Sequence, residues 1–168
     1  MKTSAIGRRL IKTFEGYSPS AYICPSGIPT IGYGHTSGVV MGDTCTKEEA
    51  EEFLKEDLKQ AENAVNMQNL DLSQTQFDAL VSLVYNIGAG AFQDSTLLKL
   101  LKQDTIARDT LETEWKKWRY SGKQELKGLV RRRAAEWSLY KNGFFLLTLP
   151  AALLAAVIAT VVLIKKSK

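Results

Sequence analysis

The chain has 168 residues, with 22 Lys and Arg, 18 Asp and Glu and one His, and a formal net charge of +4. This length accommodates one domain with a hydrophobic core plus an appendage. Two cysteines are too few for a disulfide framework and a lone histidine cannot form a metal site, so we expect no cofactor and no metal.

The first predicted helix ends at Glu15. One face of it carries the apolar residues Ile6, Leu10, Ile11 and Phe14, and Gly16 is placed to end it. Glu15 therefore lies in the last turn, where the helix dipole disfavours a carboxylate. Such a position suits a merely structural acid poorly, so Glu15 is a candidate functional residue.

A small hairpin and a series of helices are predicted after Gly16. Short strands at Tyr22–Ile23 and Thr30–Ile31 flank a turn at 25–27. Two capping boxes then open helices, namely Thr46 with Glu49 and Ser73 with Gln76. The second of these helices is apolar around most of its circumference, which predicts that it lies at the centre of the domain. Further helices are expected at 95–103, 105–118 and 129–141, giving an α+β, mostly helical fold with a small N-terminal β-hairpin sheet.

Three residues around the hairpin have the chemistry for cleaving a glycosidic bond. Such a reaction needs an acid for the leaving oxygen and a group on the opposite face of the sugar. Glu15 suits the acid, because burial and the helix dipole would both favour its protonated form. Cys24 and Thr30 follow in the pattern E-x8-C-x5-T, and the hydroxyl of Thr30 can hold a water molecule. A helix end and a hairpin mouth can converge on one cleft, since paired strands lie about 5 Å apart.

This segment resembles the active site of the phage-type lysozymes, the endolysins of glycoside hydrolase family 24. Their pattern is Glu, eight residues, Asp or Cys, five residues and Thr, then a run like TIGYGH. The likeness covers roughly residues 3–142 and continues through QFDALVSLVYNIGAGAF, STLLKLL, GLVRRRAAEW and WSLYKNG. It implies a lysozyme-like fold and hydrolysis of the β-1,4 bond between N-acetylmuramic acid and N-acetylglucosamine in bacterial peptidoglycan. Glu15 would be the general acid, and Thr30 would position the water.

Cys24 stands where many relatives have an aspartate. A free thiol has a pKa of about 8.5, and a neighbouring carboxylate would raise it. We therefore expect Cys24 to be mostly neutral at pH 7 and to assist only as a weak base. It could instead be a small apolar filler in the hairpin, or form a disulfide with Cys45 that masks the thiol.

Tyr33, Asn86 and Phe92 are the candidate substrate contacts. The resemblance favours Asn86, whose amide offers both donors and acceptors to sugar hydroxyl and acetamido groups. Tyr33 and Phe92 could line the cleft or pack in the core. His35 is expected to make a structural hydrogen bond. Core packing is expected for Trp115, Trp118 and Trp137, and internal ion pairs for one or two of Arg131, Arg132 and Arg133.

The C-terminal segment Phe144 to Ile164 contains no formally charged residue. As a helix its 21 residues would extend about 31 Å, close to the bilayer's hydrocarbon thickness of about 30 Å. We expect residues 143–168 to form a transmembrane tail anchor behind a catalytic domain at 1–142; burial of the helix in a larger assembly is the alternative. Basic residues on both sides of the span leave its orientation open.

These features predict a membrane-anchored peptidoglycan hydrolase of phage or prophage origin in a bacterial host, with no nucleic-acid partner. Residues 73–142 hold 12 basic and 8 acidic residues, which could steer an anionic polymer, although solvated helix faces give the same pattern. A lytic transglycosylase acting on the same bond is one alternative, because it needs only the acid. A catalytically silent, membrane-tethered structural protein and membrane disruption by the tail alone are the others.

Overall fold

The computed structural model describes residues 1–103, 105 and 107–148, of which 142–148 are described by their backbone alone. The helices are α1 (Ala5–Glu15), α2 (Lys47–Asn66), α3 (Gln74–Ile87), α4 (Ala89–Gln93), α5 (Thr96–Leu101), α6 (Arg108–Lys116) and α7 (Lys127–Thr148). A 3₁₀ turn, η1, spans Lys117–Arg119. Two separate hairpins consist of β1 (Ser18–Ile23) with β2 (Pro29–Gly32), and β3 (Tyr120–Ser121) with β4 (Gln124–Glu125).

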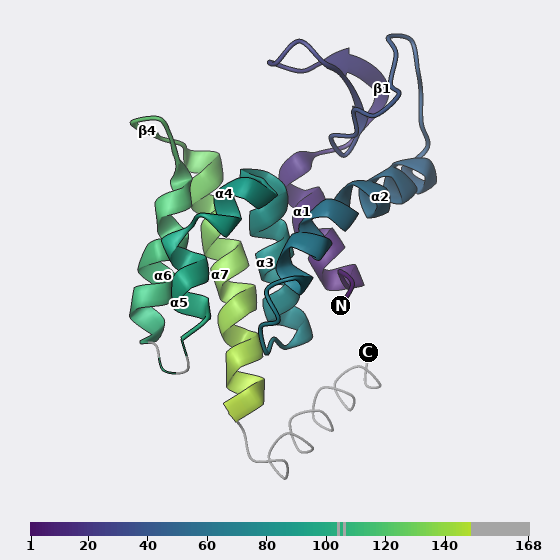
Figure 1. Ribbon diagram of the computed structural model, residues 1–168. Helices are drawn as coiled ribbons and strands as arrows, with labels where there is room; N and C mark the ends of the chain where they lie inside the picture. Colours follow the sequence, from purple (N-terminus) through teal and green to yellow (C-terminus); the bar gives the residue numbers. More distant parts are fainter. Residues whose placement is uncertain (104, 106, 149–168) are drawn as a thin grey trace, which may run out of the picture.

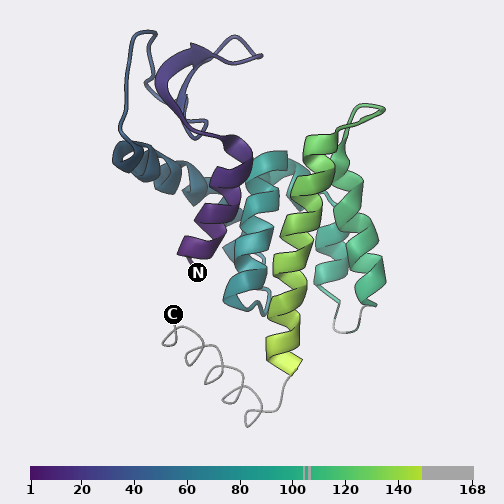
Figure 2. The same cartoon turned by 180° about the vertical axis from the view of Figure 1, so that it is seen from behind.

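The elements form two lobes. The hairpin β1–β2 and the loop before α2 make the smaller lobe, and α3 to α7 make the larger, helical lobe (Figure 1). Helices α1 and α2 run between the lobes, as the view from behind also shows (Figure 2). The C-terminal end of α1 therefore lies where the lobes meet, and Glu15 is its last residue.

Helix α1 has its predicted end because both of its termini are capped. The side chain of Ser4 accepts hydrogen bonds from the backbone N–H groups of Ile6 and Gly7. At the other end, Gly16 has φ of 74°, a left-handed conformation that favours glycine, and its N–H donates to the carbonyl of Lys12. The placement of Glu15 in the last turn is confirmed.

The antiparallel β1–β2 hairpin pairs Tyr22 with Thr30, as expected from two short strands. Strand β1 begins earlier than predicted, at Ser18, because the loop before α2 supplies additional partners: Ser20 bridges to Thr44, and the N–H of Ala21 donates to the carbonyl of Asp43 at 2.9 Å. These partners are more than 20 residues away in sequence, so no local pattern indicates them. The small β3–β4 hairpin was also not predicted.

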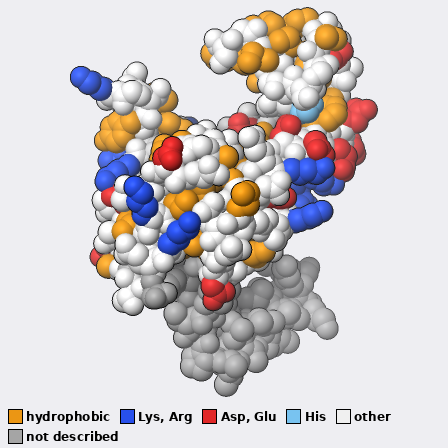
Figure 3. All heavy atoms as spheres, viewed as in Figure 1, with side chains coloured by type: hydrophobic (Ala, Val, Ile, Leu, Met, Phe, Trp, Pro, Cys, Tyr) orange, Lys and Arg blue, Asp and Glu red, His pale blue; other side chains and the backbone are white. Residues whose placement is uncertain are grey.

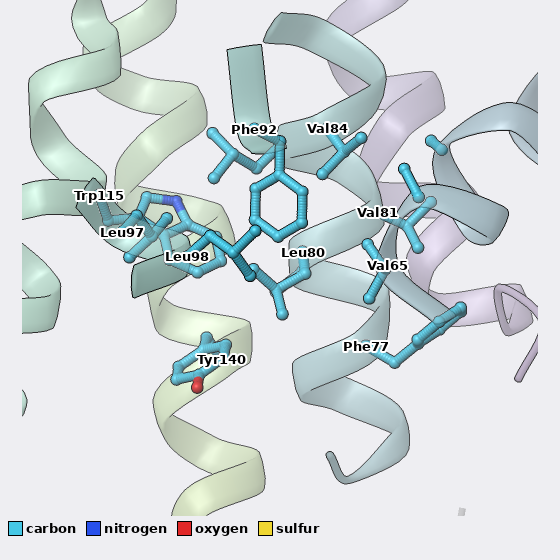
Figure 4. Close-up of a cluster of buried hydrophobic side chains, with 14 of the residues drawn as sticks. Val65, Phe77, Leu80, Val81, Val84, Phe92, Leu97, Leu98, Trp115 and Tyr140 are labelled. Carbon is cyan, nitrogen blue, oxygen red and sulfur yellow. The ribbon is translucent and has the colours of Figure 1, made fainter. Parts of the chain in front are cut away.

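Helix α3 is the centre of the larger lobe, as predicted. Every residue from Gln76 to Val84 is buried, and α3 packs against α1, α2 and α7. Both predicted capping boxes are present, at the starts of α2 and α3. The core around α3 includes side chains from the surrounding helices, as Figure 4 shows for Val65, Leu80, Phe92, Leu97, Trp115 and Tyr140. The predicted packing of the three tryptophans is confirmed: Trp115 and Trp137 are buried, and Trp118 packs against the core.

Helix α7 runs from Lys127 to Thr148, beyond the predicted end at 141. Most of the predicted tail anchor, residues 149–168, lies outside the described residues. Among the helices that the structure describes, none is both long enough and apolar enough to cross a membrane.

Candidate active site

Glu15 is held by an arginine from the other end of the chain. Its Oε1 accepts a hydrogen bond of 2.6 Å from Nη1 of Arg132, which lies on α7. The Glu15 side chain is 23% exposed and that of Arg132 only 4%, so solvent reaches the carboxyl group but hardly the arginine. Such a charge-assisted hydrogen bond is short and directional, and it fixes the orientation of the carboxyl group.

A glycine leaves the space beside Glu15 open. A Cβ atom at Gly34 would lie 3.9 Å from Glu15 Oε2 and 3.8 Å from the hydroxyl of Tyr85. Burial raises the pKa of the Tyr85 hydroxyl, and the negative charge of Glu15 raises it further. Tyr85 therefore stays protonated, and its hydroxyl lies 3.5 Å from the carbonyl oxygen of Tyr33.

Cys24 and Thr30 lie together at the turn of the hairpin. The backbone N–H of Cys24 donates to the carbonyl of Ile28 at 3.0 Å, and the hydroxyl of Thr30 donates to the same oxygen at 3.0 Å. Thr30 is only 4% exposed. Its proton stays within the hairpin, with the Ile28 carbonyl or the Cys24 sulfur as acceptor, so its oxygen lone pairs are what it can offer to a water molecule.

The expected direction of the Cys24 pKa is wrong. Hydrogen bonds from the backbone of Ile28, then from the backbone of Ser26 and the side chain of Thr30, lower the pKa of Cys24 below its ordinary value. No carboxylate is among the groups that shift it. The turn stabilises the thiolate, an effect that the sequence pattern did not reveal. Cys24 and the buried Cys45 are both free thiols in the structure, which contradicts the alternative of a disulfide between them.

The three candidate substrate contacts occupy different environments. Tyr33 is half-buried between the lobes, with its ring 5.6 Å from that of Tyr17. Asn86 is exposed at the end of α3, and its Oδ1 accepts a 3.0 Å hydrogen bond from Nη2 of Arg133. Phe92 requires a correction. It has 0% exposure and packs in the core (Figure 4), so it has no surface with which to contact a sugar.

A cavity of about 370 Å³ lies between the lobes, and Gly34, which lies beside the Glu15 carboxyl group, is part of its lining. Its lining includes Gly34, Thr36, Asp57, Gln60, Tyr85 and Ala89. Figure 3 shows the hollow between the overhanging hairpin lobe and the helical lobe. His35 has the expected structural role, because its Nδ1 lies 2.9 Å from Oδ1 of Asp57 and its ring stacks on Phe53. Within the described parts of the chain, no three His, Cys, Asp or Glu side chains are placed to hold a metal ion.

Comparison with known proteins identifies the family. A family model described as phage lysozyme matches residues 12–136. The chain belongs to the phage lysozyme family. It is 43% identical over 145 residues to the endolysin of Acyrthosiphon pisum secondary endosymbiont phage 1, covering 84% of this chain and 99% of that protein.

Solved structures of a bacterial muramidase domain and of a phage lysozyme have the same fold. The muramidase domain of SpmX from Asticaccaulis excentricus matches with a TM-score of 0.76 and 38% identity, over 83% of this chain and 97% of that one. A mutant form of P22 lysozyme matches with a TM-score of 0.75 and 37% identity, over 84% and 99%. These matches confirm the lysozyme-like fold and the prediction of a lysozyme-type glycoside hydrolase.

The sequence analysis did not identify Arg132 and Glu136 as neighbours of the Glu15 site. It predicted one or two internal ion pairs among three consecutive arginines, and the structure confirms two, at Arg132 and Arg133. The spacing of Arg132 and Glu136, one helical turn apart, was a visible signal for their pairing. The contact with Glu15 was not visible, because it spans 117 positions of sequence.

Proposed function

We propose that this phage lysozyme hydrolyses the β-1,4 bond between N-acetylmuramic acid and N-acetylglucosamine in bacterial peptidoglycan, with Glu15 as the general acid. The observation that carries the proposal is the Glu15 carboxyl group, partly exposed beside the cavity between the lobes and held by Arg132. A proton donor fixed beside an open cavity is what protonation of a glycosidic oxygen requires.

Thr30 would position the attacking water, and Cys24 would accept a proton from it. The Thr30 hydroxyl oxygen can accept a hydrogen bond from the water, since its own proton is bonded within the hairpin. Cys24, with its lowered pKa, carries more thiolate at neutral pH than an ordinary cysteine and can take a proton from that water. One proton then passes from Glu15 to the leaving oxygen as the glycosidic C–O bond breaks, and another passes from the water to the thiolate as the water oxygen bonds to the anomeric carbon.

Tyr33 and Asn86 are the proposed sugar contacts. Asn86 is exposed, and Arg133 holds its amide oxygen, which leaves the amide NH₂ group to donate to a sugar or acetamido oxygen. Tyr33 is half-buried next to Gly34, which lines the cavity, and its ring would contact a sugar there.

Residues 143–168 would anchor the catalytic domain at 1–142 to a membrane in the bacterial host. The uncharged run from Phe144 to Ile164 supports this, and so does its continuity with α7, which extends to Thr148. An enzyme held in this way would act on wall polymer close to the membrane surface.

Digestion of purified peptidoglycan tests the chemistry. The full chain should release muropeptides with new reducing ends, identified by mass spectrometry, and Glu15→Gln should release at least about a hundredfold less, the range for loss of a general acid. Glu52→Gln is the matched control, because Glu52 is exposed and pairs with Lys55 on α2. Anhydro products would instead identify a lytic transglycosylase. Equal activity of Glu15→Gln and the parent chain would remove Glu15 from the mechanism.

A further inference from the structure

The side chain behind Arg132 is a fully buried carboxylate. Glu136 on α7 has 0% exposure. Its Oε1 accepts hydrogen bonds from Ser82 Oγ at 2.7 Å, Arg133 Nη2 at 2.9 Å and Arg132 Nε at 3.1 Å. Its Oε2 accepts one from Trp115 Nε1 at 3.2 Å. Arg133 Nε also lies 2.9 Å from Oε2, although its N–H direction departs from that of a hydrogen bond.

Two arginines and two carboxylates form one charge-balanced cluster. Arg132 and Arg133 are 4% and 0% exposed, and they face Glu136 inside the protein and Glu15 at the cavity. Burial lowers the pKa of Arg133, and the charge of Glu136 opposes that change. A buried charge of this kind is tolerable only when it is paired and hydrogen-bonded.

The Arg132 guanidinium is fixed on three sides. Its Nε donates to Glu136, its Nη2 donates to the carbonyl of Ser82 at 3.2 Å, and its Nη1 donates to Glu15. The ring of Phe14 lies against the guanidinium, with its centroid 5.7 Å from Cζ. Because a guanidinium is planar and rigid, the two inner hydrogen bonds determine where Nη1 points.

We propose that Glu136 is a positioning residue for Glu15 and acts through Arg132. This inference rests on the proposed role of Glu15 as the general acid. Glu136 binds the inner edge of the guanidinium and so divides the charge of Arg132 between two carboxylates. Without that division Arg132 would turn towards Glu15 alone and favour the ionised form, which cannot donate a proton.

A simpler structural role for Glu136 is the alternative to be tested. Its bonds to Ser82, Trp115 and the arginines join α3, α6 and α7, so its loss must also lower stability. A pH–rate profile separates the two roles, because loss of stability alone does not move its limbs. The groups facing Glu15 are Arg132 from α7 and Tyr85 from α3, and the raised pKa of Tyr85 keeps its hydroxyl protonated over the pH range of this profile.

The experiment compares Glu136→Gln with the parent chain on a soluble peptidoglycan fragment from pH 4 to 9. We expect kcat at neutral pH to fall about tenfold and the basic limb to move about one unit to lower pH, the size of effect that a nearby charge has on a carboxylate. KM should change less than about twofold, because Glu136 does not reach the cavity. Glu136→Asp keeps the charge, so its basic limb should lie between those of Glu136→Gln and the parent chain.

Asp78→Asn is the matched control. Asp78 is a second carboxylate with 0% exposure, and it binds Ser4 and Gln74 at the far end of α3 from Glu15. It should lose stability but keep the parent pH profile. If Glu136→Gln also keeps the parent profile, or if Asp78→Asn shifts it equally, the positioning role is wrong.

If Glu136→Gln does not fold, Glu136→Asp gives the test, because its shorter side chain should move the basic limb in the same direction by a smaller amount. A readout independent of activity is the hydrogen exchange of Arg132 Nε–H by NMR, which should be slow in the parent chain and at least about tenfold faster without Glu136. Equal exchange in both would overturn the proposal. Protected exchange in a parent chain that releases no muropeptides would instead overturn the proposed function.

Discussion

At the residue scale, the two cysteines show how local backbone decides reactivity. Cys24 lies at the hairpin turn, where backbone hydrogen bonds lower its pKa. Cys45 is buried, and desolvation raises its pKa, aided by the charge of Glu49. The two thiols have the same intrinsic chemistry, so their environments alone separate them.

Iodoacetamide should therefore distinguish the thiols. At pH 7 we expect alkylation of Cys24 at least about tenfold faster than that of Cys45, because the thiolate is the reactive form and Cys24 is more accessible. Peptide mass spectrometry over time measures both rates in one sample. Cys24→Ser should leave only the slow reaction, and the denatured chain should label both alike. Equal rates in the folded chain would contradict the pKa difference.

Single residues could be assigned from sequence where the signal was local. Glu15 was placed correctly because its helix and Gly16 are adjacent to it. Phe92 was not, since core and cleft positions both favour aromatic side chains and only packing separates them. The direction of the Cys24 shift was missed because it comes from amide groups that a sequence pattern does not orient in space.

At the scale of elements, caps explain which boundaries were predictable. The N–H of Thr46 donates to Glu49 Oε2 at 2.8 Å, and the Thr46 hydroxyl contacts the same oxygen at 3.0 Å. A cap satisfies groups within four residues, so the start of α2 could be read from the sequence. The extension of β1 could not, because its partner is the loop at Thr44.

The capping box of α2 should stabilise the fold in a pH-dependent way. The hydrogen bonds from Thr46 lower the pKa of Glu49, so its stabilisation is present above the ordinary value of 4.5 and is lost as the pH falls through the folded value. Glu49→Ala should lower Tm by roughly 2–4 °C at pH 6.5. The difference from the parent chain should shrink towards zero near pH 3.

Thermal unfolding followed by circular dichroism at the two pH values measures this effect. Glu48→Ala is the control, because Glu48 also lies in the first turn of α2 but does not form the capping box. A Tm difference for Glu49→Ala that is the same at both pH values would show that the carboxylate charge does not matter to the cap.

At the scale of the whole molecule, different segments of the sequence supply the two lobes and the proposed tail anchor at 143–168. Helices α1 and α2 run between the lobes (Figure 1), and the cavity is lined mainly by residues of α2, α3 and the segment after β2. The tail follows directly from α7, the helix that carries Arg132 and Glu136. The mostly helical fold could be predicted from periodicity, whereas the arrangement of the lobes depends on contacts between distant elements.

Two arginines in the tail should release the chain from membranes. Leu154→Arg with Ile158→Arg places charges near the middle of the proposed span, each costing about 2.5–3.5 kcal/mol there. The parent chain should sediment with the bacterial membrane fraction, and the double variant should move to the supernatant. Leu154→Ala with Ile158→Ala should stay with the membrane. A parent chain found only in the supernatant would contradict the anchor.

The contact between Glu15 and Arg132 also bears on when the enzyme becomes active during its synthesis. Residues 1–103 contain the cavity lining and the whole hairpin, and they leave the ribosome first. The arginine that orients the carboxyl group follows 117 positions after Glu15. A nascent chain, or one that ends at a premature stop codon before α7, would have the cavity lining but not the hydrogen bond from Arg132 to Glu15. Translation thus completes the proposed site only after α7 has been made.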